Sequence, residues 1–288
     1  MDALWTSLPP VTRGWNIAIV ATSTLVTLKK VKLSSLLFQP ERAFTNQIWR
    51  LVSSFFAFGD LSMNLFMEIW FVSSSTRRVE DAFITNSSML PQVVDSFDAE
   101  QRKLLHDFIE RNKTIDFLYY LLQICIAIVL SATFGYYKLG ITLPQLGKLL
   151  CHSLIYIDSR ITPEEVLNLF GIFQFKKVYY PWVCASLDLL VVAVNLLDIN
   201  WKWYVEVILK PFIWFYTVSY GLGHLWWVLR DFLLQEVHND QNDKRRLLRQ
   251  NTLREFKVTR FDLVKEVLSM VFLPPWYWVV ISKIQRRR

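Results

Sequence analysis

The sequence has few cysteines, and their spacing fits neither a metal site nor a disulfide framework. The 288-residue chain has three, Cys125, Cys151 and Cys184, all in apolar stretches. We therefore expect buried, unreactive thiols and no metal or other cofactor. We also expect no cleavable signal peptide, because no small-residue cleavage site follows the first apolar run, which would serve as an uncleaved signal anchor.

The composition is typical of a membrane protein with large parts in water. Hydrophobic residues make up 53% of the chain, aromatics 15% and charged residues 20%. Twelve tryptophans and eleven tyrosines suit two membrane–water interfaces. The net charge of +7 comes from basic residues beside apolar segments and in the tail. We therefore expect these basic residues to bind anionic membrane lipids or a cytosolic partner, and not nucleic acid.

Arg50 is the most informative single residue. It follows Trp49 and leads directly into the apolar run Leu51–Phe58. A bare charge in hydrocarbon is costly, so this arginine must pair, snorkel or face water. Its position predicts a membrane protein in which the loop around Arg50 dips into the bilayer.

Six apolar segments predict an all-α bundle of six transmembrane helices with a partly embedded first loop. They are Trp15–Leu28, Leu61–Ser75, Phe117–Tyr137, Ile141–Ile157, Val178–Leu197 and Trp203–Leu234. Several are shorter than the roughly 20 residues that cross a bilayer. Short spans are accommodated by thinning the membrane, which would ease the passage of a polar polypeptide.

An even number of spans places both termini on one side of the membrane. Arg77-Arg78, Lys176-Lys177 and the basic tail indicate that this side is the cytosol. Lys29, Lys30, Lys32, Arg42 and Arg50 conflict with that orientation unless their loop is partly embedded. The sequons at Asn86 and Asn112 would then face the cytosol and stay unmodified.

The polar stretches complete the predicted organisation. Residues 1–234 form the membrane domain, in which 86–113 is a polar loop with one short helix. Residues 235–254 form a charged cytosolic linker, and 255–288 form an amphipathic, aromatic and basic tail. Apolar residues recur at helical spacing over 255–272, which predicts a helix lying on the membrane surface or binding a partner protein.

Several motifs in order resemble the Derlin family, rhomboid-like pseudoproteases of the endoplasmic reticulum. They are Leu8-Pro9-Pro10-Val11-Thr12-Arg13-Gly14-Trp15, Gln47-Ile48-Trp49-Arg50-Leu51, Met67-Glu68 through Val79-Glu80, Phe170-Gly171 through Tyr180-Pro181-Trp182, Gly221-Leu222-Gly223-His224 and Pro274-Pro275-Trp276-Tyr277-Trp278. Two departures are a longer loop after the second span and Ser219 where many Derlins have glycine.

The resemblance implies a role in endoplasmic-reticulum-associated degradation. Derlins help to move misfolded proteins out of the organelle beside a membrane ubiquitin ligase and its adaptor. Some carry a C-terminal Gly-x-Gly-Gln-Arg motif that recruits a cytosolic AAA ATPase. This motif is missing here, so the resemblance implies indirect recruitment through partner proteins.

We expect no hydrolase activity, although an active intramembrane rhomboid protease is the alternative. Such a protease needs Gly-x-Ser-Gly in span four and a histidine in span six. Ser153 lacks both glycines, and His152 would project from another side of the helix. His224 has no evident catalytic partner, and a structural role is expected for it. A lipid or small-solute transporter is a third possibility, but the internal repeats it would predict are missing.

The remaining candidate residues are polar side chains in apolar surroundings. Trp49 and Arg50 would anchor the loop, or contact lipid or an incoming polypeptide. Asn64 and Glu68 lie one helical turn apart, and either form structural hydrogen bonds or line a polar cavity. Glu80 would close the second span in solvent. Ser219 and Gly223 would allow close helix packing, and Asp188 could pair with Lys210.

Overall fold

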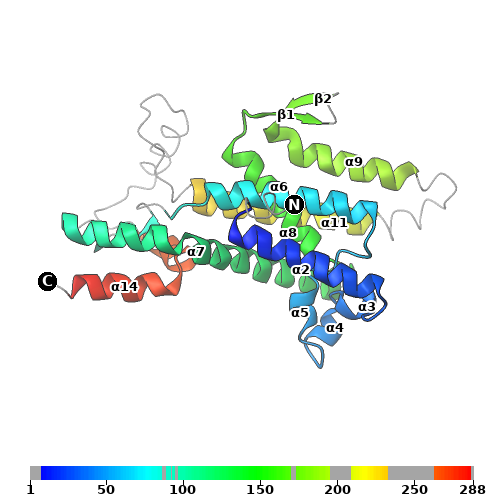
Figure 1. Cartoon of the computed structure of the whole chain (residues 1–288), viewed down its shortest axis with the longest axis horizontal. Coiled ribbons are helices and arrows are strands. Elements are labelled where there is room, and N and C mark those ends of the chain that lie inside the picture. The colour runs from blue at the N-terminus through cyan, green and yellow to red at the C-terminus, as the bar shows by residue number, and fades with distance from the viewer. Residues whose placement is uncertain are drawn as a thin grey trace. The chain divides into compact units, whose positions relative to one another are not determined.

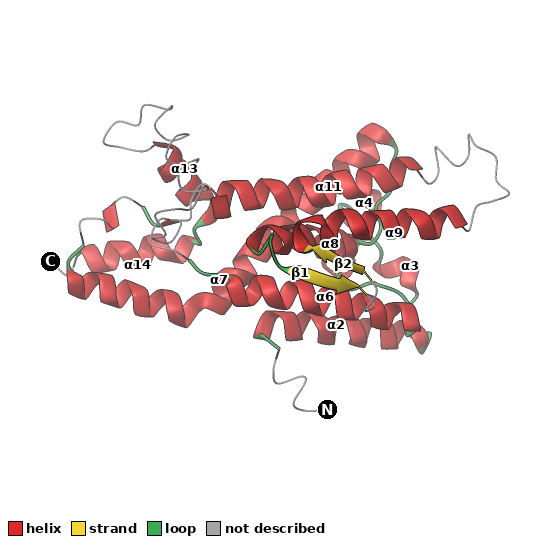
Figure 2. Cartoon of the chain, turned by 90° about the horizontal axis from the view of Figure 1, so that it is seen from above, coloured by secondary structure: helices red, strands yellow, loops and turns green. Residues whose placement is uncertain are grey.

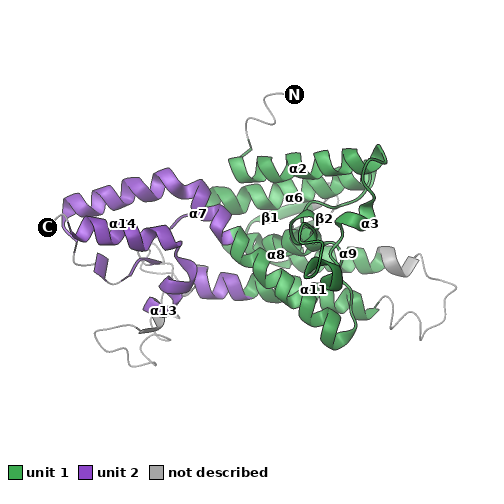
Figure 3. Ribbon diagram, turned by 90° about the horizontal axis from the view of Figure 1, so that it is seen from below, with its two compact units in different colours: residues 1–82, 121–224 green, residues 83–120, 225–288 purple. Residues whose placement is uncertain are grey.

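The computed structural model is helical apart from one short hairpin (Figure 1). It describes residues 8–85, 89–91, 93–94, 97–169, 173–194, 209–232 and 263–286. This part forms two compact units (Figure 3). Unit 1 is Met1–Ala82 with Leu121–His224, and unit 2 is Phe83–Tyr120 with Leu225–Arg288. The expected helical class is confirmed.

Unit 1 begins with α2 (Pro10–Thr27), three single-turn helices and α6 (Met63–Ala82). The short helices are α3 (Leu33–Leu36), α4 (Pro40–Ala43) and α5 (Arg50–Ser53). Proline at the first position starts α2 before the predicted Trp15. The helix α6 runs past the predicted end at Ser75, because Arg78 and Glu80 find partners on other helices and do not mark a solvated terminus.

The longest helix is α7 (Ala99–Phe134), which continues as the π-helix η3 (Gly135–Leu139). It ends at Gly140, whose φ of 66° closes the helix in the left-handed region. The sequence predicted a polar loop with one short helix over 86–113, but residues 99–113 form a continuous part of the long helix α7. These residues are helical because Leu105, Phe108 and Ile109 pack against apolar residues far away in the sequence.

The helix α8 (Leu146–Ile161) leads into a hairpin of β1 (Val166–Leu169) and β2 (Phe173–Lys176). The antiparallel strands pair Val166 with Lys176 and Leu169 with Phe173. The 3₁₀ helix η4 (Lys177–Tyr179) and α9 (Tyr180–Val194) follow. No pattern in the sequence indicated this hairpin. It places Lys177 against the end of α8.

The sixth predicted segment contains α11 (Lys210–Trp226) and the π-helix η6 (Trp227–Phe232). Its first residues, 203–208, lie outside the described residues, as do the predicted linker and residues 255–262 of the tail. The described tail consists of α13 (Leu263–Phe272) and α14 (Pro275–Gln285). Their segments Glu266–Phe272 and Pro275–Gln285 bend by 118° at the two prolines.

The helix α14 lies along the first half of α7 in unit 2 (Figure 2). Tyr277, Ile281 and Ile284 of α14, with Leu273 just before it, belong to one buried apolar cluster with Leu105 of α7. The aromatic motif that begins at Pro274 therefore starts a packed helix.

By length and composition, one described helix, Ala99–Leu139, could cross a membrane by itself. The bent pair Glu266–Phe272 and Pro275–Gln285 would be a second candidate if it formed one broken span. The number of six spans stays a prediction.

Candidate functional site

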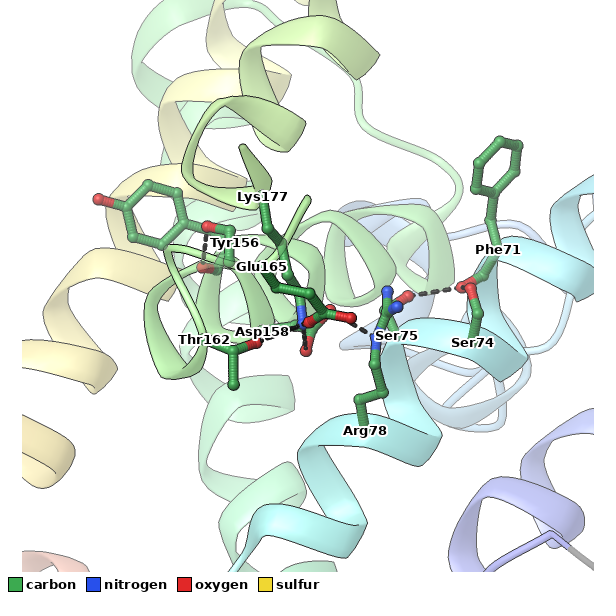
Figure 4. Close-up of polar contacts among 10 residues, drawn as sticks. Phe71, Ser74, Ser75, Arg78, Tyr156, Asp158, Thr162, Glu165 and Lys177 are labelled. Carbon is green, nitrogen blue, oxygen red and sulfur yellow. Dashed lines mark hydrogen bonds and ion pairs between the residues drawn. The ribbon is translucent and has the colours of Figure 1, made fainter. Parts of the chain in front are cut away.

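A buried ionic cluster joins three elements of unit 1. Figure 4 shows Arg78 from α6, Asp158 from α8 and Lys177 from η4 converging. The Arg78 Nε lies 2.9 Å from Asp158 Oδ2, and Lys177 Nζ lies 2.8 Å from Asp158 Oδ1. Asp158 and Lys177 are each 1% exposed. Each carboxylate oxygen therefore pairs with a cation, which offsets the desolvation cost of the buried charge.

The Lys177 ammonium has a full set of acceptors. Besides Asp158, it lies 2.9 Å from Glu165 Oε2 and donates to Thr162 Oγ1 at 2.7 Å. An ammonium has three donors, so three acceptors satisfy it. The hydrogen bond from Lys177 lowers the pKa of Glu165. Thr162 also donates to Glu165 at 3.0 Å, which closes the cluster.

The Glu80 side chain caps the N-terminus of α2. It accepts hydrogen bonds from the backbone N–H groups of Val11 at 3.0 Å and Thr12 at 2.8 Å, and from the Thr12 hydroxyl at 2.7 Å. Glu80 is 4% exposed, so the predicted solvated position is wrong. A carboxylate satisfies the unpaired amides there and complements the helix dipole.

Arg50 lies inside its own loop. It is 2% exposed, and its Nη1 donates to the carbonyl oxygens of Ser34 and Leu37, both at 2.7 Å. Its Nε donates to the Gln47 side chain. Burial lowers the pKa of Arg50, and the charge of Arg42 lowers it further. A guanidinium nevertheless stays charged at neutral pH. Of the three alternatives of pairing, snorkelling or facing water, the structure shows Arg50 paired with neutral acceptors of its own loop.

Trp49 faces outward from the same loop. Its side chain is 54% exposed, and its Nε1 lies 3.4 Å from the Ser35 carbonyl oxygen. Adjacent Ile48 and Val52 are also exposed. Arg50 thus secures the loop from within, while Trp49 is on its outer surface, where a membrane interface would accept it.

Glu68 pairs with a lysine of the fourth predicted span. Its Oε1 lies 2.6 Å from Lys148 Nζ, and both side chains are about one-third exposed. Asn64, one turn earlier on α6, is exposed. The pair joins α6 to α8.

Ser153 lies in the interface between α8 and α11. It is fully buried, and its hydroxyl lies 2.9 Å from the carbonyl oxygens of both Leu149 and Ser219. A Cβ added to Gly223 would come within 2.8 Å of the Ser153 carbonyl oxygen. The glycine therefore permits a close approach of the two helices at this serine.

His224 bonds to a tyrosine instead of a serine. Its Nδ1 lies 2.9 Å from the hydroxyl of Tyr156, one turn along α8 from Ser153. The other histidine of the region, His152, packs edge-on against Phe215 and Tyr216 with ring centroids 5.2 Å apart. His152 and His224 thus both contact aromatic side chains.

Asp188 of α9 accepts a hydrogen bond from the Tyr216 hydroxyl of α11. The structure thus gives it a partner other than the expected Lys210. The described residues contain no group of three or more His, Cys, Asp or Glu side chains that could hold a metal. The three cysteines are free thiols.

Unit 2 has its own buried carboxylate, which the sequence analysis did not identify. Asp116 of α7 is 1% exposed and accepts hydrogen bonds from Trp276 Nε1 at 3.0 Å, Thr85 Oγ1 at 3.3 Å and the Tyr277 hydroxyl. Asp158 and Lys177 of unit 1 were missed as well. Asp116 and Asp158 each lie next to the end of a predicted apolar segment, and this position was the signal in the sequence for a buried carboxylate.

Comparison with known proteins assigns the sequence to a family. A family model described as the Der1-like family matches residues 8–200. Derlin-1.2 of Zea mays is 24% identical over 188 residues, which cover 64% of each chain. Derlin-2.1 of Arabidopsis thaliana is 26% identical over 200 residues, covering 67% of this chain and 71% of the relative.

A probable derlin-2 homolog of Dictyostelium discoideum is 25% identical over 179 residues, covering 62% of this chain and 60% of the relative. The match thus covers less than two thirds of the maize and Dictyostelium proteins. Arg50, Glu80, Asp158 and Lys177 all lie within the residues that the family model matches. The chain belongs to the Der1-like family.

Proposed function

We propose that this protein is a non-hydrolytic component of endoplasmic-reticulum-associated degradation, which binds misfolded proteins and assists their passage out of the organelle. The family match over residues 8–200 is the observation that carries this proposal. On this view, the chain is a multi-pass protein of the endoplasmic reticulum membrane, with six spans and both termini in the cytosol.

The surroundings of Ser153 support a role without hydrolysis. A serine nucleophile needs a base in hydrogen-bond reach and access for the substrate carbonyl. Ser153 is fully buried in a helix interface, and its hydroxyl is directed at main-chain carbonyl oxygens. His224 is engaged with Tyr156. This arrangement favours helix packing over proton transfer to a base.

Short helices support passage through a thinned membrane. The helix α8 has 16 residues, and at 1.5 Å per residue it reaches about 24 Å, against a hydrocarbon core of about 30 Å. A helix of this length draws the two bilayer surfaces together or exposes polar groups to water. The Glu68–Lys148 pair would then lie on a polar path across α6 and α8.

The partners follow from the same proposal. Misfolded proteins would be the substrates, and a membrane ubiquitin ligase with its adaptor would receive them. A cytosolic AAA ATPase would act indirectly. Membrane lipids would contact exposed apolar side chains, such as Val267, Met270 and Val271 on one side of α13.

The proposal is tested by following a misfolded lumenal protein in cells that express variants at equal abundance. Arg50→Ala removes the bonds that secure the loop, and degradation should slow. Arg42→Ala, a change at an exposed arginine of the same loop, is the matched control. Ser153→Ala should not abolish any cleavage product of the misfolded protein. Normal degradation with Arg50→Ala, or a product that depends on Ser153, would contradict the proposal.

A further inference from the structure

The helix α9 carries a carboxylate that the proposed function does not use. Asp188 is exposed, and it accepts one hydrogen bond, from the Tyr216 hydroxyl of α11. His152 of α8 is near enough to interact electrostatically with Asp188, but its ring packs against Phe215 and Tyr216. Among the described residues, no lysine or arginine pairs with Asp188 and no second hydrogen-bond donor reaches it. Because each carboxylate oxygen can accept hydrogen bonds, Asp188 can still bind another group.

Asp188 lies at the middle of the predicted span Val178–Leu197. It is ten positions after the first residue of the span and nine before the last. At 1.5 Å per residue these distances are about 15 Å and about 14 Å, so Asp188 lies near the centre of a hydrocarbon core about 30 Å thick. A carboxylate at this depth is costly unless it faces water or pairs with another polar group.

The other charges of the first five predicted spans already have partners. Apart from His152, those spans contain three acidic or basic side chains, Glu68, Lys148 and Asp188. Glu68 Oε1 and Lys148 Nζ lie 2.6 Å apart. In the described part of these spans, Asp188 is therefore the one carboxylate that lacks a lysine or arginine partner.

The helix around Asp188 is exposed on every side. All five residues from 186 to 190 are exposed: Ser186, Leu187, Asp188, Leu189 and Leu190. Successive residues of a helix are about 100° apart, so five of them pass around the whole circumference. Inside a membrane such a surface contacts lipid tails or another helix, and lipid tails offer the carboxylate no cation.

We propose that this part of α9 binds a transmembrane helix of another protein, which carries a lysine or arginine near the middle of its span. The cation pairs with Asp188, whose carboxylate is held in place by Tyr216, and apolar side chains of that helix pack on the exposed leucines beside it. Charge complementarity selects the partner, because a purely apolar helix gains little that lipid does not supply, and an acidic one is repelled. The inference rests on the membrane location in the proposed function and not on the role in degradation.

The test measures energy transfer in phosphatidylcholine vesicles between the labelled full chain and a labelled polyleucine helix of about 20 residues. One helix carries lysine at its centre, and otherwise identical helices carry glutamine or leucine there. The lysine helix should associate about tenfold more tightly than the leucine helix, as expected for one polar contact between helices in a membrane. Asp188→Asn should remove this difference, and Asp188→Glu should keep it.

The matched control is Ser186→Asn, which introduces the same amide about 200° around the helix from Asp188. It should keep the preference for the lysine helix. Equal association of the lysine and leucine helices with the natural protein would overturn the inference, as would equal association of the lysine and glutamine helices. A preference that survives Asp188→Asn would overturn it too. The comparison of the three helices on the natural protein does not depend on any variant being folded.

Cysteine labelling separates a failure of this inference from a failure of the proposed membrane arrangement. A membrane-impermeant maleimide should label Ser186→Cys no more than it labels the natural protein. Stronger labelling would place this part of α9 in water and would overturn both. Equal association of the three helices without such labelling would overturn the inference alone.

Discussion

Asp158 in unit 1 and Asp116 in unit 2 are equally buried, each 1% exposed, but their partners differ in charge. Asp158 lies between the cations of Arg78 and Lys177. Asp116 accepts hydrogen bonds from an indole, a phenol and a hydroxyl, and among the described residues the cation that acts on it, Arg230, does so through charge and not through a hydrogen bond. Arg230 of the same unit stacks over Phe83, with its Cζ 4.0 Å from the ring centroid.

The two carboxylates differ in the kind of buried group that stays without a partner when the carboxylate is removed. Loss of Asp158 would leave a fully buried ammonium with a half-exposed Glu165 as its remaining carboxylate partner. Loss of Asp116 would leave three neutral hydrogen-bond donors, whose desolvation costs less than that of a charge, and would remove a weaker charge interaction with Arg230. Unit 1 should therefore depend on charge balance, and unit 2 on hydrogen bonding and apolar packing.

The largest expected effect is that of Asp158→Asn. It should lower the free energy of unfolding by about 3 kcal/mol, because it breaks a buried ion pair at one partner only. Adding Lys177→Met should recover most of this loss, since the remaining charge is removed too. Unfolding of purified protein in detergent measures both. A double variant no more stable than Asp158→Asn would show that charge balance is not what the cluster provides.

A smaller effect is expected for Asp116→Asn. The amide still accepts hydrogen bonds with its oxygen, so the cost should be about 1–2 kcal/mol. Hydrogen exchange of α14 amides reports the change in unit 2. If Asp116→Asn costs as much as Asp158→Asn, the contrast between neutral and charged partners fails.

Tyr277→Phe tests one of the neutral partners alone. The ring stays in its core position against Leu105 and Ile281, while one hydrogen bond to Asp116 is lost. The expected cost is about 1 kcal/mol. Tyr137→Phe removes a hydroxyl from a residue that is 59% exposed and should change stability very little. Equal effects of the two changes would mean that the buried bond contributes nothing.

The smallest expected effect is the loss of one stabilising contribution at low pH. Because the Glu165 pKa is lowered in the folded state, its stabilisation is present above the unfolded value of about 4.3 and is lost as the pH falls through the folded value. The difference in unfolding free energy between the natural protein and Glu165→Gln should therefore shrink from pH 6 to pH 3. A difference that grows on acidification would reverse the assigned sign.

The sequence predicted the features that depend on neighbours along the chain. Apolar runs located the helices, and the position of Arg50 indicated a charge that must be paired. Residues 86–113 were expected to form a loop with one short helix, because the mixed polarity of 99–113 obscures a face that packs on α14, more than 150 residues later. Asp158 and Lys177 meet only through the unpredicted hairpin.

In its proposed role, the chain guides a polypeptide instead of cutting it, so a substrate in transit should lie beside the polar pair of α6 and α8. The most direct measurement is photocrosslinking from a photoreactive residue at Asn64, beside the Glu68–Lys148 pair, during stalled degradation of a misfolded lumenal protein. Leu130, which is 65% exposed on α7, is the control position. Adducts with the substrate are expected from Asn64, and adducts with lipid from Leu130. Lipid adducts alone from both positions would contradict it.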